Sequence, residues 1–472
     1  MHLIPAITKF LMTLNIITTI MSSTTSTTST TSTTSATPVL TRDVCIIGGG
    51  AAGTYAAIRL QQLGKSVVVI DNKPRLGGQT TTYTNPAITP LPIEYGVTYY
   101  QNMSIVRDFF GHFNIPLTYS AFDYKIDMFD FVTGTAIPAT AEAESNAAMD
   151  RYIAQLREYP YLRVGFDLPD PVPEDLVMPF GEFVGKYNLE AGVGDLGGSI
   201  DPLGNWPDLP ALYVMKYANL EVLEGDRNGF VRPKGRNNSE LYGEAEKELG
   251  QEGLLLGSEV VSMDRDESAD WVYVTVRKGE EETTVQAKSL VVAMQPSLDS
   301  LKGFDLGVKE KTLFGQFNNL FFYTALVRIK GLPDRMCYMN RGANDSFLIP
   351  RLPSMLVLKP TEASELKVAN YLSTKALSEE EVKQGMLHDM ESIRRRTEID
   401  FPDPEFLAIG DHSPYQLTVP AEAIKNGFYR ELNALQGERR TFYTAATWES
   451  HSTPQIWEFT EQMLQNHLLK SL

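Results

Sequence analysis

Three glycines near the start of the chain have the spacing of a phosphate-binding turn. Gly48, Gly50 and Gly53 form a G-x-G-x-x-G pattern, and a stretch of helix-forming residues begins with Ala51 and Ala52. The first glycine permits a tight turn, the second lets backbone approach a pyrophosphate, and the third allows a helix to pack closely on a strand. The start of that helix offers its N–H groups and positive dipole end to phosphates. The pattern predicts a dinucleotide site; the alternative is a glycine-rich turn without a ligand.

The elements around these glycines favour the dinucleotide site. A short apolar run at 44–47 precedes them, a helical stretch at 51–63 follows, and a β-branched run at 67–70 ends on Asp71. Dinucleotides bind to such a strand–turn–helix–strand unit when an acid ends its second strand. Asp71 is placed to accept hydrogen bonds from ribose hydroxyls, and we include the adjacent Asn72 in the predicted site.

A second glycine pair indicates which of two cofactors, FAD or a nicotinamide dinucleotide, the site binds. Arg75, Gly77 and Gly78 form an R-x-G-G sequence directly after the acid. This sequence resembles the element that follows the Rossmann unit in the amine-oxidase superfamily of flavoproteins, where the glycines let backbone lie against the flavin and its diphosphate. A simple nicotinamide dehydrogenase does not need such a pair. The resemblance therefore implies FAD.

The composition excludes several kinds of partner. The chain has 472 residues, of which 43% are hydrophobic and 10% aromatic, as expected for a globular protein with a large core. Its formal net charge of −17 argues against a nucleic acid or an anionic membrane as partner, because both require a basic face. The two cysteines and six histidines show no metal-ligand spacing, so we expect neither a metal nor a disulfide framework.

The N-terminal region differs in composition from the rest. Residues 1–21 place a lysine before a mostly apolar run, which predicts a signal peptide and secretion; the alternative is a cytoplasmic protein that begins at Met21. Residues 22–40 are rich in serine and threonine and predict a disordered linker. The apolar run is too short for a stable membrane span.

The remaining pattern predicts an α/β (α+β) fold in which a Rossmann-type FAD-binding domain is interleaved with a sheet-and-helix substrate domain. The expected FAD-binding segments are 41–100, 241–300 and 436–472, the helical substrate part is 101–240, and the substrate domain is 301–435. Helices are expected at 104–113, 141–159, 178–187, 210–219, 378–396 and 453–464. Strands are expected at 117–128, 259–261 (parallel), 271–276, 283–287, 290–293, 348–358 (a pair) and 441–443.

The chain after residue 40 resembles the fungal β-cyclopiazonate dehydrogenase group of monoamine-oxidase-like flavoproteins. The resemblance is carried by GGGAAGTYAAIRL, GKSVVVID, RLGG and the closing pattern at 448–461 with IWEFTE. More distantly, 209–217 and 435–443 are similar to segments of bacterial polyenoic fatty acid isomerases. The resemblance implies that the backbone of Val260 meets the adenine, that Trp448 also borders FAD, and that the last helix points its N-terminus at the flavin.

Three departures from the superfamily pattern affect the predicted site. The acid that usually follows the last strand is replaced by TAA at 444–446. The lysine that often holds a water near the flavin is absent from 317–327, where Tyr323 and Thr324 lie near its expected position. Gln79 follows the glycine pair and no cysteine lies near the C-terminus, so we expect FAD to bind without a covalent link.

Three functions are compatible with these residues. The leading hypothesis is an FAD-dependent dehydrogenase or oxidase that removes hydride from a C–H bond beside a nitrogen or an activated ring of a small amine- or indole-type molecule. The second is a redox-neutral isomerase of polyunsaturated fatty acids, and the third is a flavin-fold binding protein without activity. The substrate is thus expected to be apolar, aromatic or lipid. No catalytic residue or oligomeric state is predicted; the candidates for lining the flavin ring are Tyr95, Tyr323, Trp448 and His451.

Overall fold

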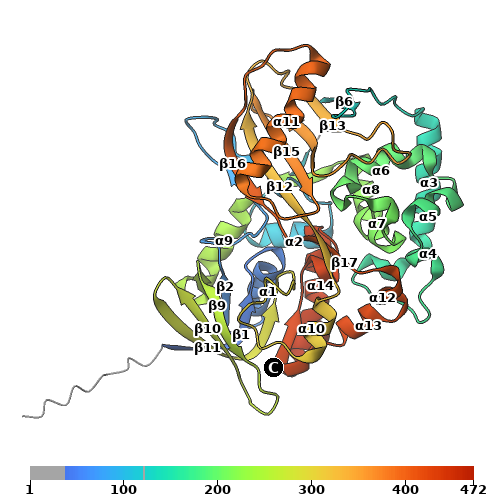
Figure 1. Ribbon diagram of the computed structural model, residues 1–472. Helices are drawn as coiled ribbons and strands as arrows, with labels where there is room; N and C mark the ends of the chain where they lie inside the picture. Colours follow the sequence, from blue (N-terminus) through green and yellow to red (C-terminus); the bar gives the residue numbers. More distant parts are fainter. Residues whose placement is uncertain (1–37, 121–122) are drawn as a thin grey trace, which may run out of the picture. The chain divides into compact units, whose positions relative to one another are not determined.

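The computed structural model describes residues 38–120 and 123–472, so the predicted signal peptide and most of the predicted linker lie outside the described residues (Figure 1). Two seven-stranded mixed sheets organise the described chain. The first sheet has the order β8-β2-β1-β11-β10-β9, with β18 also paired to β11. Its strands are β1 (Val39–Ile47), β2 (Val67–Asp71), β8 (Leu254–Leu256), β9 (Glu259–Asp264), β10 (Val272–Lys278), β11 (Glu281–Val292) and β18 (Thr441–Tyr443).

The first sheet is of the Rossmann type where the glycine motif lies. Strands β8, β2, β1, β11 and β18 are parallel, and the apolar run at 44–47 in β1 is buried because helices cover the sheet. The covering helices are α1 (Ala51–Gln62), α9 (Ser239–Leu249) and α14 (Thr453–Met463), of which α9 and α14 both contact α1. The predicted strand, turn, helix and second strand are therefore confirmed.

Two predictions for this sheet were wrong. The strand at 259–261 is not parallel: β9 runs antiparallel to β10, and β8 takes the parallel position beside β2. A short apolar run carries no information on direction, which depends on the partner strand. The runs at 283–287 and 290–293 form one strand, β11, whose first part pairs with β10 and whose last part pairs with β18.

The second sheet has the order β16-β12-β15-β14-β13-β6, with β17 also paired to β12. Its strands are β6 (Lys125–Phe129), β12 (Asn318–Arg328), β13 (Met336–Asn340), β14 (Ser354–Pro360), β15 (Leu366–Ser373), β16 (Glu405–Asp411) and β17 (Tyr415–Thr418). Helix α11 (Glu379–Thr397) covers one face, and a capping box between Ser378 and Glu381 starts it (Figure 1). The strand pair expected at 348–358 is wrong in its first half, because β14 begins only at Ser354 and 348–353 is a loop.

Short helices build the remaining wall of the molecule. They enclose an aromatic core that includes Phe180, Trp206 and Tyr213, and the helices expected at 141–159, 178–187 and 210–219 are confirmed with ends shifted by up to two residues. The helices of this wall are α3 (Glu142–Glu158), α4 (Glu174–Val177), α5 (Phe180–Tyr187), α6 (Val193–Ile200), α7 (Ala211–Tyr217), α8 (Leu220–Asn228), α10 (Val308–Phe314), α12 (Ala421–Lys425) and α13 (Phe428–Asn433). Helices α2 (Ser104–His112) and α15 (Leu469–Ser471) instead pack in the core beside α1 and α14. Two small strand pairs complete the structure: β3 (Thr82–Tyr83) with β4 (Ile93–Glu94), and β5 (Leu117–Ser120) with β7 (Phe230–Pro233).

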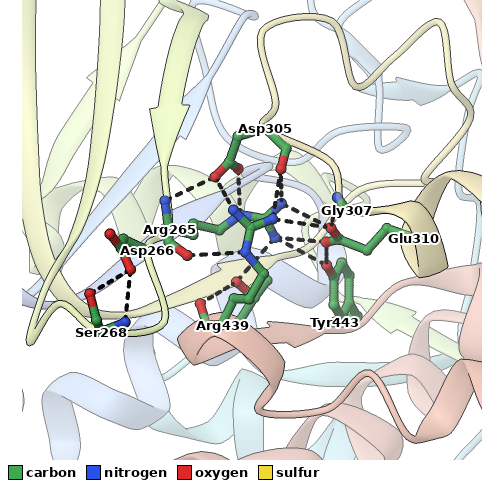
Figure 2. Close-up of polar contacts among 9 residues, drawn as sticks. Arg265, Asp266, Ser268, Asp305, Gly307, Glu310, Arg439 and Tyr443 are labelled. Atoms are coloured by element: carbon green, nitrogen blue, oxygen red, sulfur yellow. Dashed lines mark hydrogen bonds and ion pairs between the residues drawn. The ribbon is translucent and has the colours of Figure 1, made fainter.

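A group of charged side chains beside the first sheet joins three segments that are distant in the sequence (Figure 2). Arg265, which follows β9 and is 1% exposed, donates to Asp305 at 2.7 Å and to Glu310 of α10 at 2.7 Å. Arg439 donates to the Asp305 carbonyl at 2.6 Å, and the hydroxyl of Tyr443 in β18 contacts Glu310. We call these five residues the Arg265 cluster. It fastens β18 and α10 to the antiparallel part of the sheet.

Candidate FAD and substrate site

The glycine turn between β1 and α1 has the close contacts that its spacing predicts. A Cβ on Gly53 would lie 1.8 Å from the carbonyl oxygen of Gly48, so only glycine lets α1 approach β1 this closely. Gly48 itself has a φ of +102°, which a side chain disfavours. At Gly50 the only atom within 4 Å of a Cβ would be the Cα of Gly78, at 3.7 Å. Packing within the protein therefore does not require glycine at position 50, and the space beside its Cα is free for a ligand.

The R-x-G-G segment lies directly against this turn. Gly77 N donates to the carbonyl of Gly49 at 2.8 Å, and a Cβ on Gly78 would lie 2.8 Å from the Cα of Gly50. From α9, the Glu246 carboxylate accepts from the N–H of Leu76 at 2.6 Å and holds the segment in place. Two glycine segments thus form one bare backbone surface at the start of α1, which fits a pyrophosphate.

Asp71 ends β2 beside the same turn. Its two carboxylate oxygens accept from Gly49 N at 2.6 Å and Lys73 N at 2.7 Å, which fixes the side chain and leaves further lone pairs for a ribose. The neighbouring Asn72 is exposed, and Arg75 donates to the carbonyl of Leu76 at 2.9 Å. The structure therefore brings the predicted residues from Gly48 to Gly78 together at one edge of the sheet.

The other two predicted FAD contacts come from later segments of the chain. Val260, the second residue of β9, lies two positions after Ser258, whose N–H donates to the carbonyl of Asp71 at 3.0 Å. Trp448 is 1% exposed and stacks on Tyr443 with ring centroids 5.3 Å apart, and its indole nitrogen has no hydrogen-bond partner among the described residues. Neither residue lines the cavity described next.

A cavity of about 860 Å³ extends from the R-x-G-G segment to the helical wall. Gln79, which follows the glycine pair, lines it. So do Ser450 to Pro454, which lead into the first turn of α14 and place the positive end of that helix at the cavity. The inner wall is formed by largely buried side chains, namely Tyr217, Phe322, Thr324, His412, Tyr415 and His451.

His412 is the most notable titratable group of the inner wall. It follows β16 and is 5% exposed. Its Nε2 lies 3.0 Å from the hydroxyl of Thr324, and its Nδ1 has no hydrogen-bond partner among the described residues. The Gln79 amide donates to the His412 carbonyl at 3.0 Å. Burial and the charge of Lys73 lower the pKa of His412 to about 3, so the ring is neutral at ordinary pH.

An aromatic group stands beside His412. The Tyr415 and His451 rings are 3.9 Å apart, and the Tyr415 hydroxyl hydrogen-bonds to that of Tyr217 at 2.5 Å. His451 Nε2 accepts from Gln416 N at 3.0 Å, and burial lowers the pKa of His451 to about 3. The inner wall thus combines neutral histidines with aromatic rings.

A buried ion pair supports the loop that carries His451. Lys216 of α7 is 2% exposed and contacts the fully buried carboxylate of Glu449. Lys216 also donates to the Leu162 carbonyl at 2.8 Å, and Gly165 N contacts the other oxygen of Glu449. The pair therefore ties the cavity loop to two segments of the helical wall.

Of the four expected ring-lining residues, His451 alone lines the cavity. Tyr323 points away from it and donates to the Leu377 carbonyl at 3.2 Å, because successive strand residues face opposite sides and Thr324 takes the cavity side. Tyr95 lines no part of the cavity. His412 was not among the predicted residues; its one signal in the sequence is a histidine directly after a strand, in GDHSP.

These features define a class: a flavoprotein of amine-oxidase-like architecture, with a Rossmann glycine turn, a second glycine pair and a substrate cavity at the N-terminus of the last long helix. Residues 46–113 match the family model of the NAD(P)-binding Rossmann-like domain. The chain is 38% identical over 439 residues to the FAD-dependent oxidoreductase dbaF of Emericella nidulans, with 91% of each protein covered. It is 32% identical over 431 residues to the beta-cyclopiazonate dehydrogenase of Aspergillus oryzae, covering 90% of this chain and 92% of the relative. The chain belongs to this family of fungal FAD-dependent oxidoreductases.

Solved structures show the same fold. The CLA-producing fatty acid isomerase from P. acnes superposes with a TM-score of 0.75 at 17% identity, over 90% of this chain and 98% of that one. The cyclohexylamine oxidase from Brevibacterium oxydans gives a TM-score of 0.61 at 16% identity, over 90% and 99%. The predictions of an amine-oxidase-like fold, of FAD as cofactor and of an oxidoreductase are confirmed.

Among the described residues, no helix is both long and apolar enough to cross a bilayer. In the same part of the chain, no group of three or more His, Cys, Asp or Glu side chains could hold a metal ion.

Proposed function

We propose that the chain oxidises a small organic molecule with an aromatic or apolar part, at a carbon beside a nitrogen or an activated ring. The observation that supports this is the cavity, which joins the residue after the R-x-G-G segment to the N-terminus of α14 and has neutral, aromatic inner walls. When bound, FAD supplies a hydride acceptor for such a carbon. The beta-cyclopiazonate dehydrogenase relative supports a dehydrogenation.

We propose that the chain holds FAD through the bare surface of its two glycine segments, through Asp71 and through Val260 and Trp448. Cys45 and Cys337 are buried in strands β1 and β13 and do not line the cavity, which supports FAD without a link to cysteine. The full set of proposed contacts is Gly48, Gly50, Ala51, Ala52, Gly53, Asp71, Asn72, Arg75, Gly77, Gly78, Val260 and Trp448.

The chain's own residues have two roles in this proposal. The rings of Tyr415, Phe322 and Tyr217 hold the apolar part of the substrate and keep water away from the reacting carbon. His412 accepts, at Nδ1, the proton that the substrate's heteroatom loses as the neighbouring C–H bond is oxidised, because that atom is neutral and has no other partner among the described residues. Thr324 fixes the ring through Nε2.

Two other proposals concern the chain as a whole. Secretion rests only on the sequence pattern of residues 1–21, with a start at Met21 as the alternative. The division into three FAD-binding segments and two substrate segments is supported by the two sheets, since strands of the first come from 39–71, 254–292 and 441–443.

An absorbance spectrum of the purified protein tests the proposed function. Indole-type amines and polyunsaturated fatty acids are added without oxygen, and air is then admitted. We expect flavin bands that bleach with an amine or a related aromatic compound and recover in air. Conversion of a fatty acid without net bleaching would instead assign the protein as an isomerase, and a protein that cannot take up FAD would contradict the proposal.

A further inference from the structure

The far end of the cavity differs from the inner end. Where the inner wall is largely buried, the far wall is formed by solvent-accessible residues of α3, α6 and α8, namely Asn146, Asp195, Gly198, Asp226 and Arg227. A ligand that fills the cavity therefore has one end among aromatic rings and the other among these polar side chains. This outer end has no role in the proposed chemistry.

Two carboxylates set the charge of the outer end. Asp226 accepts from the Ser199 hydroxyl at 3.3 Å, and Asp195 contacts the Ser145 hydroxyl of α3. Asp226 is exposed, and partial burial of its carboxyl group raises its pKa. Both carboxylates keep oxygen lone pairs for a ligand.

The positive charge of the outer end is engaged elsewhere. The Arg227 guanidinium lies 3.2 Å from Asp150, which does not line the cavity. His412 and His451, the two histidines of the wall, have pKa values of about 3 and stay neutral. The lining residues therefore favour a positive over a negative ligand group.

Aromatic rings adjoin the carboxylates. Tyr99 and Phe230 line the cavity with their ring centroids 4.7 Å apart. The Phe230 ring packs on Gly225, the residue before Asp226: a Cβ on Gly225 would lie 2.3 Å from this ring. A carboxylate beside aromatic faces is a favourable environment for an ammonium group.

Two residues of the cavity wall away from the carboxylates have a buried polar atom without a partner in the described part of the chain. The Ser450 hydroxyl, on a residue 6% exposed, has no hydrogen-bond partner among the described residues, and the same holds for Nδ1 of His412. Both residues line the cavity.

We propose that the substrate is an amphipathic cation whose ammonium group binds between Asp226 and Asp195, while its aromatic or apolar part reaches the inner wall. The cation serves as a recognition group, remote from the carbon that is oxidised. This inference rests on the proposed function, because it takes the cavity as the substrate site. It also disfavours a free fatty acid, whose carboxylate would meet two carboxylates and an arginine that already has a partner.

Calorimetric titration of the FAD-loaded protein tests the inference without requiring turnover. The ligands are phenylalkyl chains of matched length that end in an ammonium, a hydroxyl or a carboxylate group, taken over a series of chain lengths. We expect the ammonium ligand to bind at least about 10-fold more tightly than the carboxylate, as one well-placed charge contact provides. Asp226→Asn should remove most of this preference and leave the hydroxyl ligand within about twofold.

Glu224→Gln is the matched control, because Glu224 is an exposed carboxylate of the same helix that does not line the cavity. This variant should keep the full preference. Asp195→Asn provides a second test if Asp226→Asn does not fold. Equal binding of ammonium and carboxylate by the unmodified protein, or equal losses in the Asp226 and Glu224 variants, would overturn the inference. Failure of the proposed function would appear separately, as tight amine binding without flavin bleaching in the absorbance experiment.

Discussion

Nε2 of His412 lies 3.0 Å from the hydroxyl of Thr324, in a residue pair that joins β12 to the end of β16. The contact occupies one ring nitrogen and leaves Nδ1 buried without a hydrogen-bond partner among the described residues. Thr324 and His412 both line the cavity. Their geometry is that of a proton acceptor held in one orientation by its neighbour.

Replacing His412 should therefore slow oxidation more than it weakens cofactor binding. We expect His412→Gln to lower kcat by about 100-fold, since a positioned base typically contributes that much or more. Thr324→Val should have a smaller effect, because it removes only the orienting contact. Steady-state kinetics give kcat, and the flavin spectrum of each variant shows whether FAD is still bound. An unchanged kcat in His412→Gln would exclude the proposed role.

The pH profile offers a second measurement on the same residue. A base works in its neutral form, which His412 keeps above its pKa of about 3. Protonation of His412 should therefore cause no fall in kcat as the pH is lowered from about 8 to about 5, below the ordinary histidine value. A decline centred near pH 6.5 that is absent from His412→Gln would show that this ring is protonated in the ordinary range.

Alanine substitutions at two glycines of the same turn should have different effects, one on folding and the other on FAD binding. Gly53→Ala places a methyl group 1.8 Å from the Gly48 carbonyl, so we expect the protein to lose several kcal/mol of stability or not to fold. Gly50→Ala meets no protein atom closer than 3.7 Å and should fold normally, yet its methyl group would occupy the space of the pyrophosphate. Thermal unfolding of the FAD-free proteins and FAD titration measure the two effects. Equal FAD affinity in Gly50→Ala and the unmodified protein would place the pyrophosphate elsewhere.

The buried pair of Lys216 and Glu449 predicts a non-additive set of variants. Lys216→Met leaves the Glu449 carboxylate buried without its cation and should cost about 3–5 kcal/mol of unfolding free energy. The double variant Lys216→Met/Glu449→Gln contains no such charge and should be more stable than Lys216→Met alone. Denaturant unfolding measures the unmodified protein, Lys216→Met, Glu449→Gln and the double variant. A double variant that loses the sum of both single effects would argue against direct coupling of the pair.

The Arg265 cluster predicts sensitivity to acid. Burial alone would raise the pKa of Glu310, but the hydrogen bonds and charge of Arg265 outweigh it and the pKa is lowered (Figure 2). A carboxyl group with a lowered pKa stabilises the folded state above its ordinary value of 4.5, and this contribution is lost as the pH falls through the lowered value.

Glu310→Gln should therefore flatten the acid limb of the stability curve. The free energy of unfolding of the unmodified protein is expected to fall below about pH 4.5, and that of the variant to be lower near neutral pH but less dependent on pH. Unfolding at several pH values provides the comparison. Parallel curves for the two proteins would show that Glu310 does not contribute to acid sensitivity.

Local sequence predicted the cofactor half of the site well. The turn from Gly48 to Gly53 needs only neighbouring residues, and its strand, helix and second strand follow from short apolar and helical runs. The contact between Gly78 and Gly50 was not predicted, because the sequence indicated only that both glycine segments lie against the cofactor. Helix α11, by contrast, was predicted from Ser378 and the acidic residues that follow it.

The substrate half could not be predicted because separate segments of the chain meet in it. Thr324, His412 and His451 come from a strand, a loop and another loop, and no spacing in the sequence links them. The ion pair of Lys216 with Glu449 spans 233 positions, so nothing in the neighbourhood of either residue indicates it. The predicted direction of β9 was wrong for the same reason, because the direction of a strand depends on the strand that it pairs with.

The two parts of the site come from segments that lie far apart in the chain. The phosphate turn lies near residue 50, but β18 and the loop before α14 come from the final 32 residues, after Thr441. The turn needs only neighbouring residues to form, whereas the second end of the cavity forms only when the segment from Thr441 onward packs into place. The glycine turn and the helix end at the cavity therefore become one site only when early and late segments of the described chain pack together.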